Sequence, residues 1–284
     1  MKFCRLLRYE FTEQIIKNRR YLIVPLFTWF YCLQISGLFY NINPDLHASI
    51  GDYLLYIFSG TDPFVKSGQF EYPFFWMALL IISFFVITGF VQKDLHGYGA
   101  QMLIRSSTRK KWWASKCVSC ILMSAVFVAL VILSTAIFCL CSNGRISFIL
   151  SSEIIEADAN GTYSAAQNNL NLDARTTAAL LLSIPITIIG AMNMIQLFFS
   201  LLIGTIGSFI LVNAYMTMVL FVVSPVILPG YLMLNHSSVF IVDGLNYRLG
   251  IISGLLLIIA AWLLGNMIFQ KADIIEREKF DDYI

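Results

Sequence analysis

The most restrictive feature of this sequence is a run of 67 residues, 176–242, that contains no Lys, Arg, Asp or Glu. As one helix it would extend roughly 100 Å at about 1.5 Å per residue, whereas about 20 residues cross a bilayer core about 30 Å thick. The run must therefore fold back at least once. The break is predicted at 204–208, because two glycines there interrupt a pattern of Leu, Ile and Phe.

Four more charge-free stretches are long enough to cross a bilayer. They are Tyr21–Pro44, Tyr72–Gln92, Cys117–Gly144 and Leu249–Gln270. We therefore predict an all-α polytopic membrane protein with six transmembrane helices. Their predicted ranges are about 21–41, 73–91, 117–141, 178–202, 208–228 and 249–270.

Two predicted segments flank this transmembrane domain of residues 21–270. Residues 1–20 are expected to form an interfacial amphipathic helix, and residues 271–284 a cytoplasmic tail. Within the domain, Val226–Tyr247 stays apolar but contains Pro, Gly, Asn and His. This segment is predicted as a re-entrant or interfacial hairpin rather than a seventh span.

The composition supports a membrane protein. The chain is 58% hydrophobic and 13% charged, whereas soluble domains carry about 25% charged residues. A soluble enzyme, a nucleic-acid-binding domain and a disordered chain are therefore excluded, and the lipid bilayer is the expected surrounding.

Lys and Arg are distributed unevenly between the predicted loops. Residues 1–20 contain six of them, and the loop 93–116 contains six more. The loops after the first and third spans contain three, together with eight Asp or Glu. Because basic loops remain cytoplasmic, the N-terminus and the loop 93–116 are predicted to be cytoplasmic. Six crossings would return the C-terminus to the same side.

Apolar residues recur every four positions near the N-terminus, as expected for a helix lying along the inner leaflet. They are Phe3, Leu7, Phe11 and Ile15. The basic residues around them include Arg5, Arg8, Arg19 and Arg20. The stripe is imperfect, because Glu10 and Gln14 fall near its apolar side. One interpretation is a helical hinge that passes force to the first span, and the other is a charged anchor that only fixes topology.

The loop after the second predicted span contains more signals than a connector needs. Gly97 and Gly99 predict a break, and Ser107 could cap a new basic helix over 109–116. Trp112 and Trp113 stand where an interfacial aromatic belt is expected. The loop suits docking onto another protein, although a simple basic loop with interfacial tryptophans would have a similar composition.

This order of elements resembles the permease subunit of ABC-2 type ABC transporters. The local motif of the resemblance covers residues 92–116, and the architecture covers nearly the whole chain. The resemblance implies an ATPase-docking loop that contains Asp94, Gly97, Leu103, Ser107, Arg109, Lys110 and Lys116. It also implies that residues 1–20 are the family's interfacial connecting helix, and 226–247 its outer re-entrant segment.

The resemblance implies a function in transport. The chain has no Gly-rich loop ending in Lys-Ser/Thr, so a separate cytoplasmic ABC ATPase would supply ATP hydrolysis. A second permease chain, identical or a sister, would complete the pathway. The expected role is export of an apolar, amphipathic or peptide-like substrate across a bacterial plasma membrane, without catalytic residues, a metal or a cofactor of its own.

Two other functions remain open at this stage. A non-transporting scaffold or sensor could use the same docking loop. An intramembrane hydrolase would need paired catalytic groups within the spans, whereas His47, His96 and His236 all lie outside the apolar cores. Six cysteines in or beside the helices predict no disulfide framework.

Polar residues inside the predicted spans are sparse. Asn193 and Gln196 share a face of one predicted helix, and Asn213 lies in the next. They could bond across helices or line a cargo pathway. The outer loop 143–175 is interpreted either as a solvated insertion or as a guard at an exit.

Overall fold

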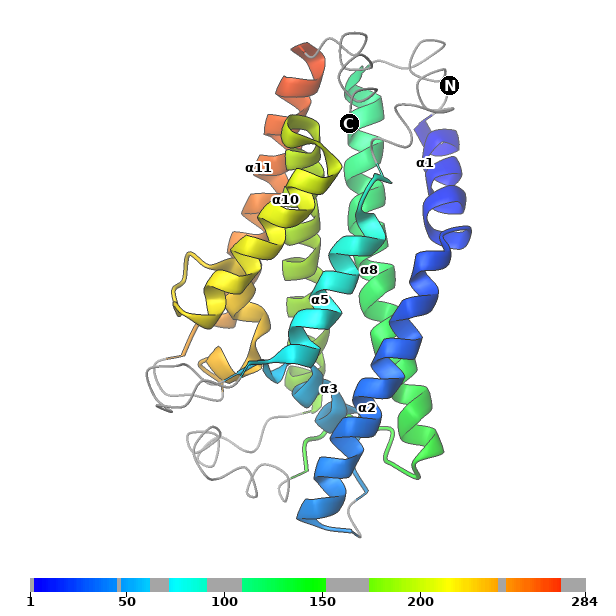
Figure 1. Cartoon of the computed structure of the whole chain (residues 1–284), viewed down its shortest axis with the longest axis vertical. Helices are drawn as coiled ribbons and strands as arrows, with labels where there is room; N and C mark the ends of the chain where they lie inside the picture. The colour runs from blue at the N-terminus through cyan, green and yellow to red at the C-terminus, as the bar shows by residue number, and fades with distance from the viewer. Residues whose placement is uncertain are drawn as a thin grey trace.

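The protein is described by a computed structural model that covers residues 3–44, 47–61, 72–90, 109–151, 174–239 and 244–271. Every regular element in these ranges is a helix, and no strand occurs among them. The helices form an elongated bundle, with α1 (Phe3–Phe11) and the end of α11 (Tyr247–Lys271) at the same end (Figure 1). The predicted all-α class is therefore confirmed for the described residues.

Among the residues that the structure describes, four stretches of helix are long and apolar enough to cross a membrane. The first, Arg19–Ile42, joins the 3₁₀ turn η2 (Arg19–Leu22) to α2 (Ile23–Ile42). The others are α8 (Arg109–Cys141), Thr177–Leu220 and Tyr247–Gln270. The predicted count of six spans and the predicted orientation stay predictions.

The long helix α10 (Ala174–Thr217) contains a sharp break at Gly204. The backbone there is not helical, with φ 78° and ψ 179°, a conformation that glycine adopts without the penalty of a Cβ. Figure 1 shows the chain reversing its direction along the bundle between the green and yellow halves of α10. The reversal falls in the segment 204–208, where the sequence predicted it. The second half ends at Thr217, earlier than the predicted 228, and continues as the 3₁₀ turn η4 (Met218–Leu220).

Helix α5 (Phe74–Ile87) has 14 residues and is shorter than the predicted span of 73–91. It ends because Thr88 turns to an extended backbone with ψ 129°, and Gly89 follows with φ 80°. A second short helix, α3 (Ile50–Ser59), lies where the sequence analysis placed only an outer loop. Ser49 and Asp52 form a capping box at its start, and Asp52 also accepts from the Ser151 N–H at 2.9 Å.

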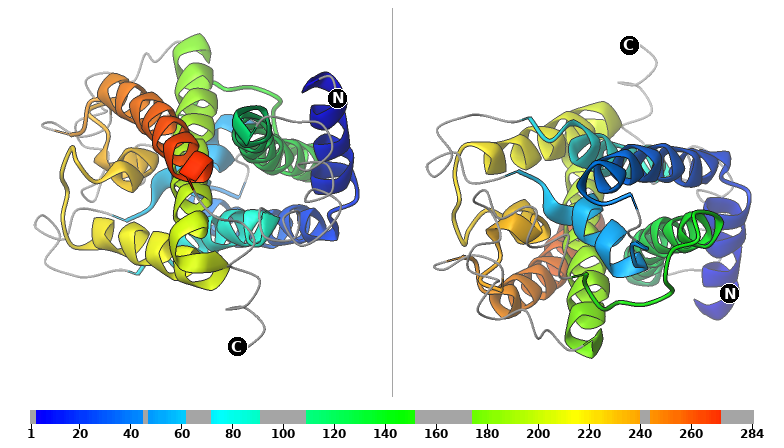
Figure 2. Two further views of the ribbon diagram at one scale, coloured as in Figure 1. Left: turned by 90° about the horizontal axis from the view of Figure 1, so that it is seen from above. Right: turned by 90° about the horizontal axis from the view of Figure 1, so that it is seen from below.

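The apolar segment after α10 packs into the bundle as two 3₁₀ turns. They are η5 (Leu228–Leu232), which contacts α10 and α11, and η6 (Leu234–His236), which contacts α3. All residues of both turns are buried. Seen from above, η5 lies on one side of the bundle and α1 on the other, beside α8 (Figure 2).

The outward faces of the long helices are apolar. On α11 the exposed large side chains include Leu249, Ile252, Leu256, Ile259 and Leu263. A soluble monomer rarely exposes so extended an apolar surface. Together with the length of the helices, this surface identifies a membrane protein.

Candidate functional site

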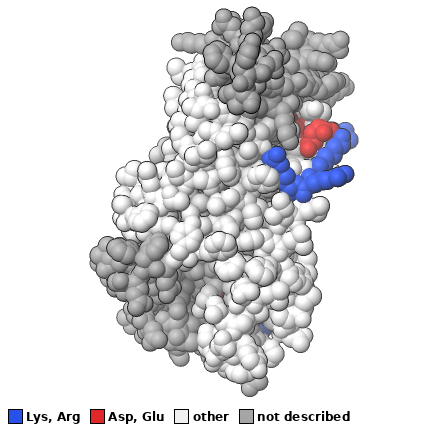
Figure 3. All heavy atoms as spheres, in the orientation of Figure 1, with Lys and Arg blue, Asp and Glu red and all other residues white. Residues whose placement is uncertain are grey.

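Charged side chains gather at the end of the bundle where α1, the end of α5 and the start of α8 meet. On the face shown in Figure 3, Lys, Arg and acidic atoms cluster on one flank, and almost all other described side chains are uncharged. This junction borders the loop that the sequence predicts to dock a partner, and it forms the candidate site.

A buried ion pair joins α1 to α8. Lys116 Nζ donates to Glu10 Oε1 at 2.5 Å, and neither side chain is exposed. The ammonium group also lies 4.5 Å from the centroid of the Phe90 ring and 5.1 Å from that of Trp112. Such aromatic faces attract a desolvated cation. The arrangement fixes the N-terminal helix against the start of α8.

This pair explains the imperfect apolar stripe of the N-terminal helix. Glu10 lies four residues after the buried Leu6, so both occupy the face that packs on α8. Lys116, which the sequence assigned to the ATPase-docking loop, has its own charge buried and paired with Glu10 inside the protein, and its docking role stays a prediction. Phe11, expected on the apolar face, is 41% exposed.

Arg20 joins the N-terminal segment to the end of α5. Its Nη1 donates to the carbonyl oxygens of Phe85 at 2.9 Å and of Thr88 at 2.7 Å. The guanidinium carbon lies 4.6 Å from the centroid of the Phe85 ring. The last carbonyls of a helix have no partner within it, and the helix dipole favours a cation there. Arg20 therefore caps α5 at the point where the chain leaves for residues 91–108.

Asn18 holds the turn that carries Arg20. Its Oδ1 accepts from the Arg20 N–H at 3.2 Å, which caps η2, and its Nδ2 donates to the Val86 carbonyl at 3.4 Å. The sequence did not predict Asn18, Thr88 or Glu10 as partners. The only sequence signals were an Asn before a short helix and an acid on an apolar face.

The start of α8 is fixed to the end of α11. Arg109 Nη1 donates to the Gln270 carbonyl at 3.0 Å, and Trp113 Nε1 donates to the Trp262 carbonyl at 2.9 Å. Trp112 stacks on Phe269 with ring centroids 4.7 Å apart.

The sequence predicted an interfacial aromatic belt at Trp112 and Trp113, whereas the structure buries both rings inside the bundle. Trp112 is 1% exposed and Trp113 is not exposed at all. They are buried because α11 packs directly over them: a Cβ added at Gly265 would lie 2.1 Å from Cζ2 of Trp113.

Asn193 and Gln196 bond across helices. Asn193 Nδ2 donates to Ser124 Oγ of α8 at 2.9 Å and to Ser83 Oγ of α5 at 3.3 Å. Gln196 Nε2 donates to Thr88 Oγ1 at 2.9 Å. Both residues are buried, and these contacts favour the interpretation of helix contact over that of a cargo-lining patch. Asn213 instead donates to the Phe209 carbonyl of its own helix at 2.7 Å.

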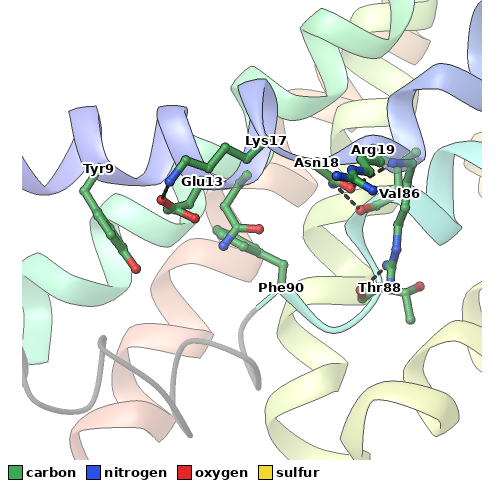
Figure 4. Close-up of a pocket in the computed structure, with 10 residues that line it drawn as sticks. Tyr9, Glu13, Lys17, Asn18, Arg19, Val86, Thr88 and Phe90 are labelled. Atoms are coloured by element: carbon green, nitrogen blue, oxygen red, sulfur yellow. Dashed lines mark hydrogen bonds and ion pairs between the residues drawn. The ribbon is translucent and has the colours of Figure 1, made fainter.

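A cavity of about 480 Å³ opens between the N-terminal turns and the end of α5. It is lined by Tyr9, Glu13, Gln14, Lys17, Asn18, Arg19, Arg20, Val86, Thr88 and Phe90. Figure 4 shows Tyr9, Glu13 and Lys17 on the side of α1 and of the π-helical turn η1 (Thr12–Ile16), with Val86 and Thr88 opposite. Glu13 and Lys17 form an ion pair within the turn. The cavity is therefore cationic on balance, with three basic residues and one acid.

Of the other site residues predicted from the sequence, the structure describes only some. Asp94, Gly97, Leu103 and Ser107 lie outside the described residues, as do most of the loop 143–175 and the tail from 272. Lys110 is exposed at the start of α8, and Arg8 is exposed on α1. Arg5 lies in α1, but its side chain is outside the description.

The model of one protein family matches residues 29–275. The chain belongs to the DUF2705 family. That family is described as a protein of unknown function, so membership assigns no chemistry. Searches of curated proteins and of solved structures each found no match.

The DUF2705 match begins within α2. It includes α5, α8, α10 and α11 but not Glu10 and Arg20. Each of these two residues therefore bonds from outside the matched range to a partner inside it.

Proposed function

We propose that this chain is the membrane-spanning permease subunit of an ABC-2 type transporter, driven by a separate cytoplasmic ATPase. The observation that carries the proposal is that the N-terminal segment contacts the helices on both sides of residues 91–108. At one end Arg20 caps α5, and at the other Glu10 pairs with Lys116 of α8. The N-terminal segment thus contacts both the end of α5 and the start of α8, the two helices that flank the loop on which the ATPase would dock.

This anchoring suits the transmission of force. A load on residues 91–108 reaches α1 through the Glu10–Lys116 pair and α2 through Arg20. It reaches α11 through Arg109 and the two buried tryptophans. A loop that only connected two spans would need none of these contacts.

In the proposed cycle, ATP closes a pair of ATPase subunits and pushes on the loops of two permease chains. The membrane halves then part toward the outside. The energy of ATP binding is used to shift the population between two packings of the bundle. The second chain is either a copy of this one or a sister subunit.

The interior of the bundle favours an apolar, amphipathic or peptide-like cargo. Asn193 and Gln196 bond to α5 and α8, and the buried core around them is predominantly apolar. An apolar path imposes little desolvation cost on an apolar substrate. We propose export as the direction and the plasma membrane of a bacterium as the location.

Co-purification tests the proposal. The chain is co-expressed with the ATPase encoded beside it in the genome, and the solubilised complex is assayed for retention of the ATPase. Lys110→Glu should weaken retention, because Lys110 is exposed beside the loop. Arg145→Glu reverses an exposed charge just beyond the other end of α8 and should have no effect.

Two outcomes would contradict the proposal. One is a chain that never retains an ATPase. The other is retention without ATP-dependent flux into vesicles, which would indicate a scaffold or sensor.

A further inference from the structure

We propose that the cavity between α1, η2 and the end of α5 binds a phosphate group, supplied by the headgroup of an anionic phospholipid. The cavity is the one lined by Lys17, Arg19 and Arg20. This inference goes beyond the transport function and does not depend on it, because it concerns only the groups that surround the cavity.

The charges around the cavity favour an anion. Three basic residues face one carboxylate, that of Glu13, which is already paired with Lys17. The Lys17 side chain is still 62% exposed, and Arg19 is exposed too. Both cations can therefore reach an incoming ligand, and phosphate is an anion that Lys and Arg side chains bind well.

Arg20 adds donors that are fixed in place. An arginine has five N–H donors, and both bonds to the end of α5 use Nη1. The guanidinium is thus held at the cavity wall while its other N–H groups remain for a ligand. A fixed arginine binds phosphate at a lower cost in side-chain entropy than a free one.

The size of the cavity fits a headgroup. Its volume of about 480 Å³ lies within the range of roughly 300–1,000 Å³ that is typical of small-molecule sites. Inorganic phosphate alone would leave much of this space to water, whereas a phosphate with its glycerol substituents would occupy more of it.

An exposed apolar stripe begins directly beside the cavity. It favours a lipid as the source of the phosphate group. Residues i and i+3 of a 3₁₀ turn eclipse each other, so Leu22 stands over Arg19 in η2. Leu22 is 64% exposed, and Leu26 and Leu33 continue its face along α2 at 72% and 50%. A phospholipid with its phosphate in the cavity would lay an acyl chain along this stripe.

Lipid retention tests this site. The full chain is embedded in nanodiscs of equimolar phosphatidylglycerol and phosphatidylcholine, and the lipids kept on release are counted by native mass spectrometry. The wild type should retain phosphatidylglycerol in preference. Lys17→Gln with Arg19→Gln should lower that preference on the order of 25-fold, since each basic residue at an anionic surface contributes about a fivefold factor.

Matched variants distinguish the effect of the charges in the cavity from the effect of charges elsewhere on the surface. Lys110→Gln with Lys111→Gln removes the same charge from exposed positions on α8, outside the cavity, and should lower the preference much less. Glu13→Gln removes the carboxylate from the cavity and should raise it. If the double variant at 17 and 19 misfolds, Arg19→Gln alone should show about a fivefold loss.

A second arm distinguishes the source of the phosphate. Inorganic phosphate is titrated by calorimetry onto the detergent-solubilised chain without phospholipid. Weak or absent heat beside clear phosphatidylglycerol retention supports the lipid as ligand. Strong binding of inorganic phosphate that Arg19→Gln abolishes would keep the phosphate site but overturn the lipid as its source. Equal retention by wild type and the variant at 17 and 19, or equal loss in the variant at 110 and 111, would overturn the site itself.

Discussion

Lys116 and Glu10 lie 106 positions apart in the chain and form an ion pair of 2.5 Å from which solvent is excluded. The pair connects the N-terminal helix to the start of α8. Desolvation makes such a pair costly to form, and the loss of one partner leaves a buried charge. The stability of the protein is therefore expected to be sensitive to the loss of either partner.

Breaking this pair should strongly destabilise the protein. Glu10→Ala or Lys116→Met should each cost about 3–5 kcal/mol, measured as a lower midpoint of thermal unfolding in detergent. The combination Glu10→Leu with Lys116→Met should recover much of the loss, because no charge is then left buried. Lys110→Met, on an exposed residue, is the control. Additive losses in the double variant would contradict a paired role.

Removing the cap on α5 should loosen the end of that helix. Arg20→Gln loses the bonds to the Phe85 and Thr88 carbonyls, and we expect a cost of about 1–2 kcal/mol. Hydrogen exchange should rise in the amides at the end of α5 and stay constant in α11. Arg8→Gln removes an exposed charge from α1 and should change neither.

The packing of α11 over α8 can be tested with two glycines. Gly265→Ala would place a methyl group 2.1 Å from an atom of the buried Trp113 ring, so we expect a loss of about 1–3 kcal/mol. Gly37→Ala adds the same methyl group to α2, where no atom lies within 4 Å. This control should be neutral or stabilising by about 0.5–1 kcal/mol. Equal midpoints of unfolding would contradict the close contact.

The bonds of Asn193 give a test of helix contact against cargo binding. Asn193→Leu leaves the hydroxyls of Ser83 and Ser124 without their donor and should cost about 0.6–1.7 kcal/mol. If Asn193 acts only in helix contact, the specificity of transport should stay constant while the unfolding midpoint falls. A changed substrate range at unchanged stability would favour the pathway instead.

The predicted orientation can be tested with native cysteines. Cys141 is exposed at the end of α8, whereas Cys32, Cys117, Cys120 and Cys139 are buried. In a Cys4→Ser background, a membrane-impermeant maleimide should label Cys141 in intact cells, because this end of α8 is predicted to face outward. Cys141→Ser should abolish the signal. Labelling only after the cells are opened would reverse the orientation.

Helices bounded by charges were predictable because the length of an apolar run can be compared directly with the thickness of a bilayer. The break at Gly204 was predictable for a similar reason, since the run is too long for one crossing. The short helix α3 was missed because its 10 residues are too few to cross a bilayer and Asp52 lies among them. Its stability comes from packing inside the bundle.

The roles of single charged residues were harder to predict. Lys116 contributes to the basic count of its loop whether it is exposed or buried, so counting could not distinguish the two. Trp112 and Trp113 match an interfacial belt by position alone, and only the neighbouring α11 shows that they are covered. The contacts of Asn193 and Gln196 were among the alternatives, but their partners could not be named.

The sequence by itself determined the class of this protein: a helical membrane chain with a basic N-terminal segment and a basic loop. These properties are local, because hydrophobic length and charge are fixed by consecutive residues. Only the tertiary structure decided which residues meet, such as Arg20 with Thr88 across 68 positions. Such contacts depend on how each helix is rotated and which helix lies beside it, and no local pattern contains that information.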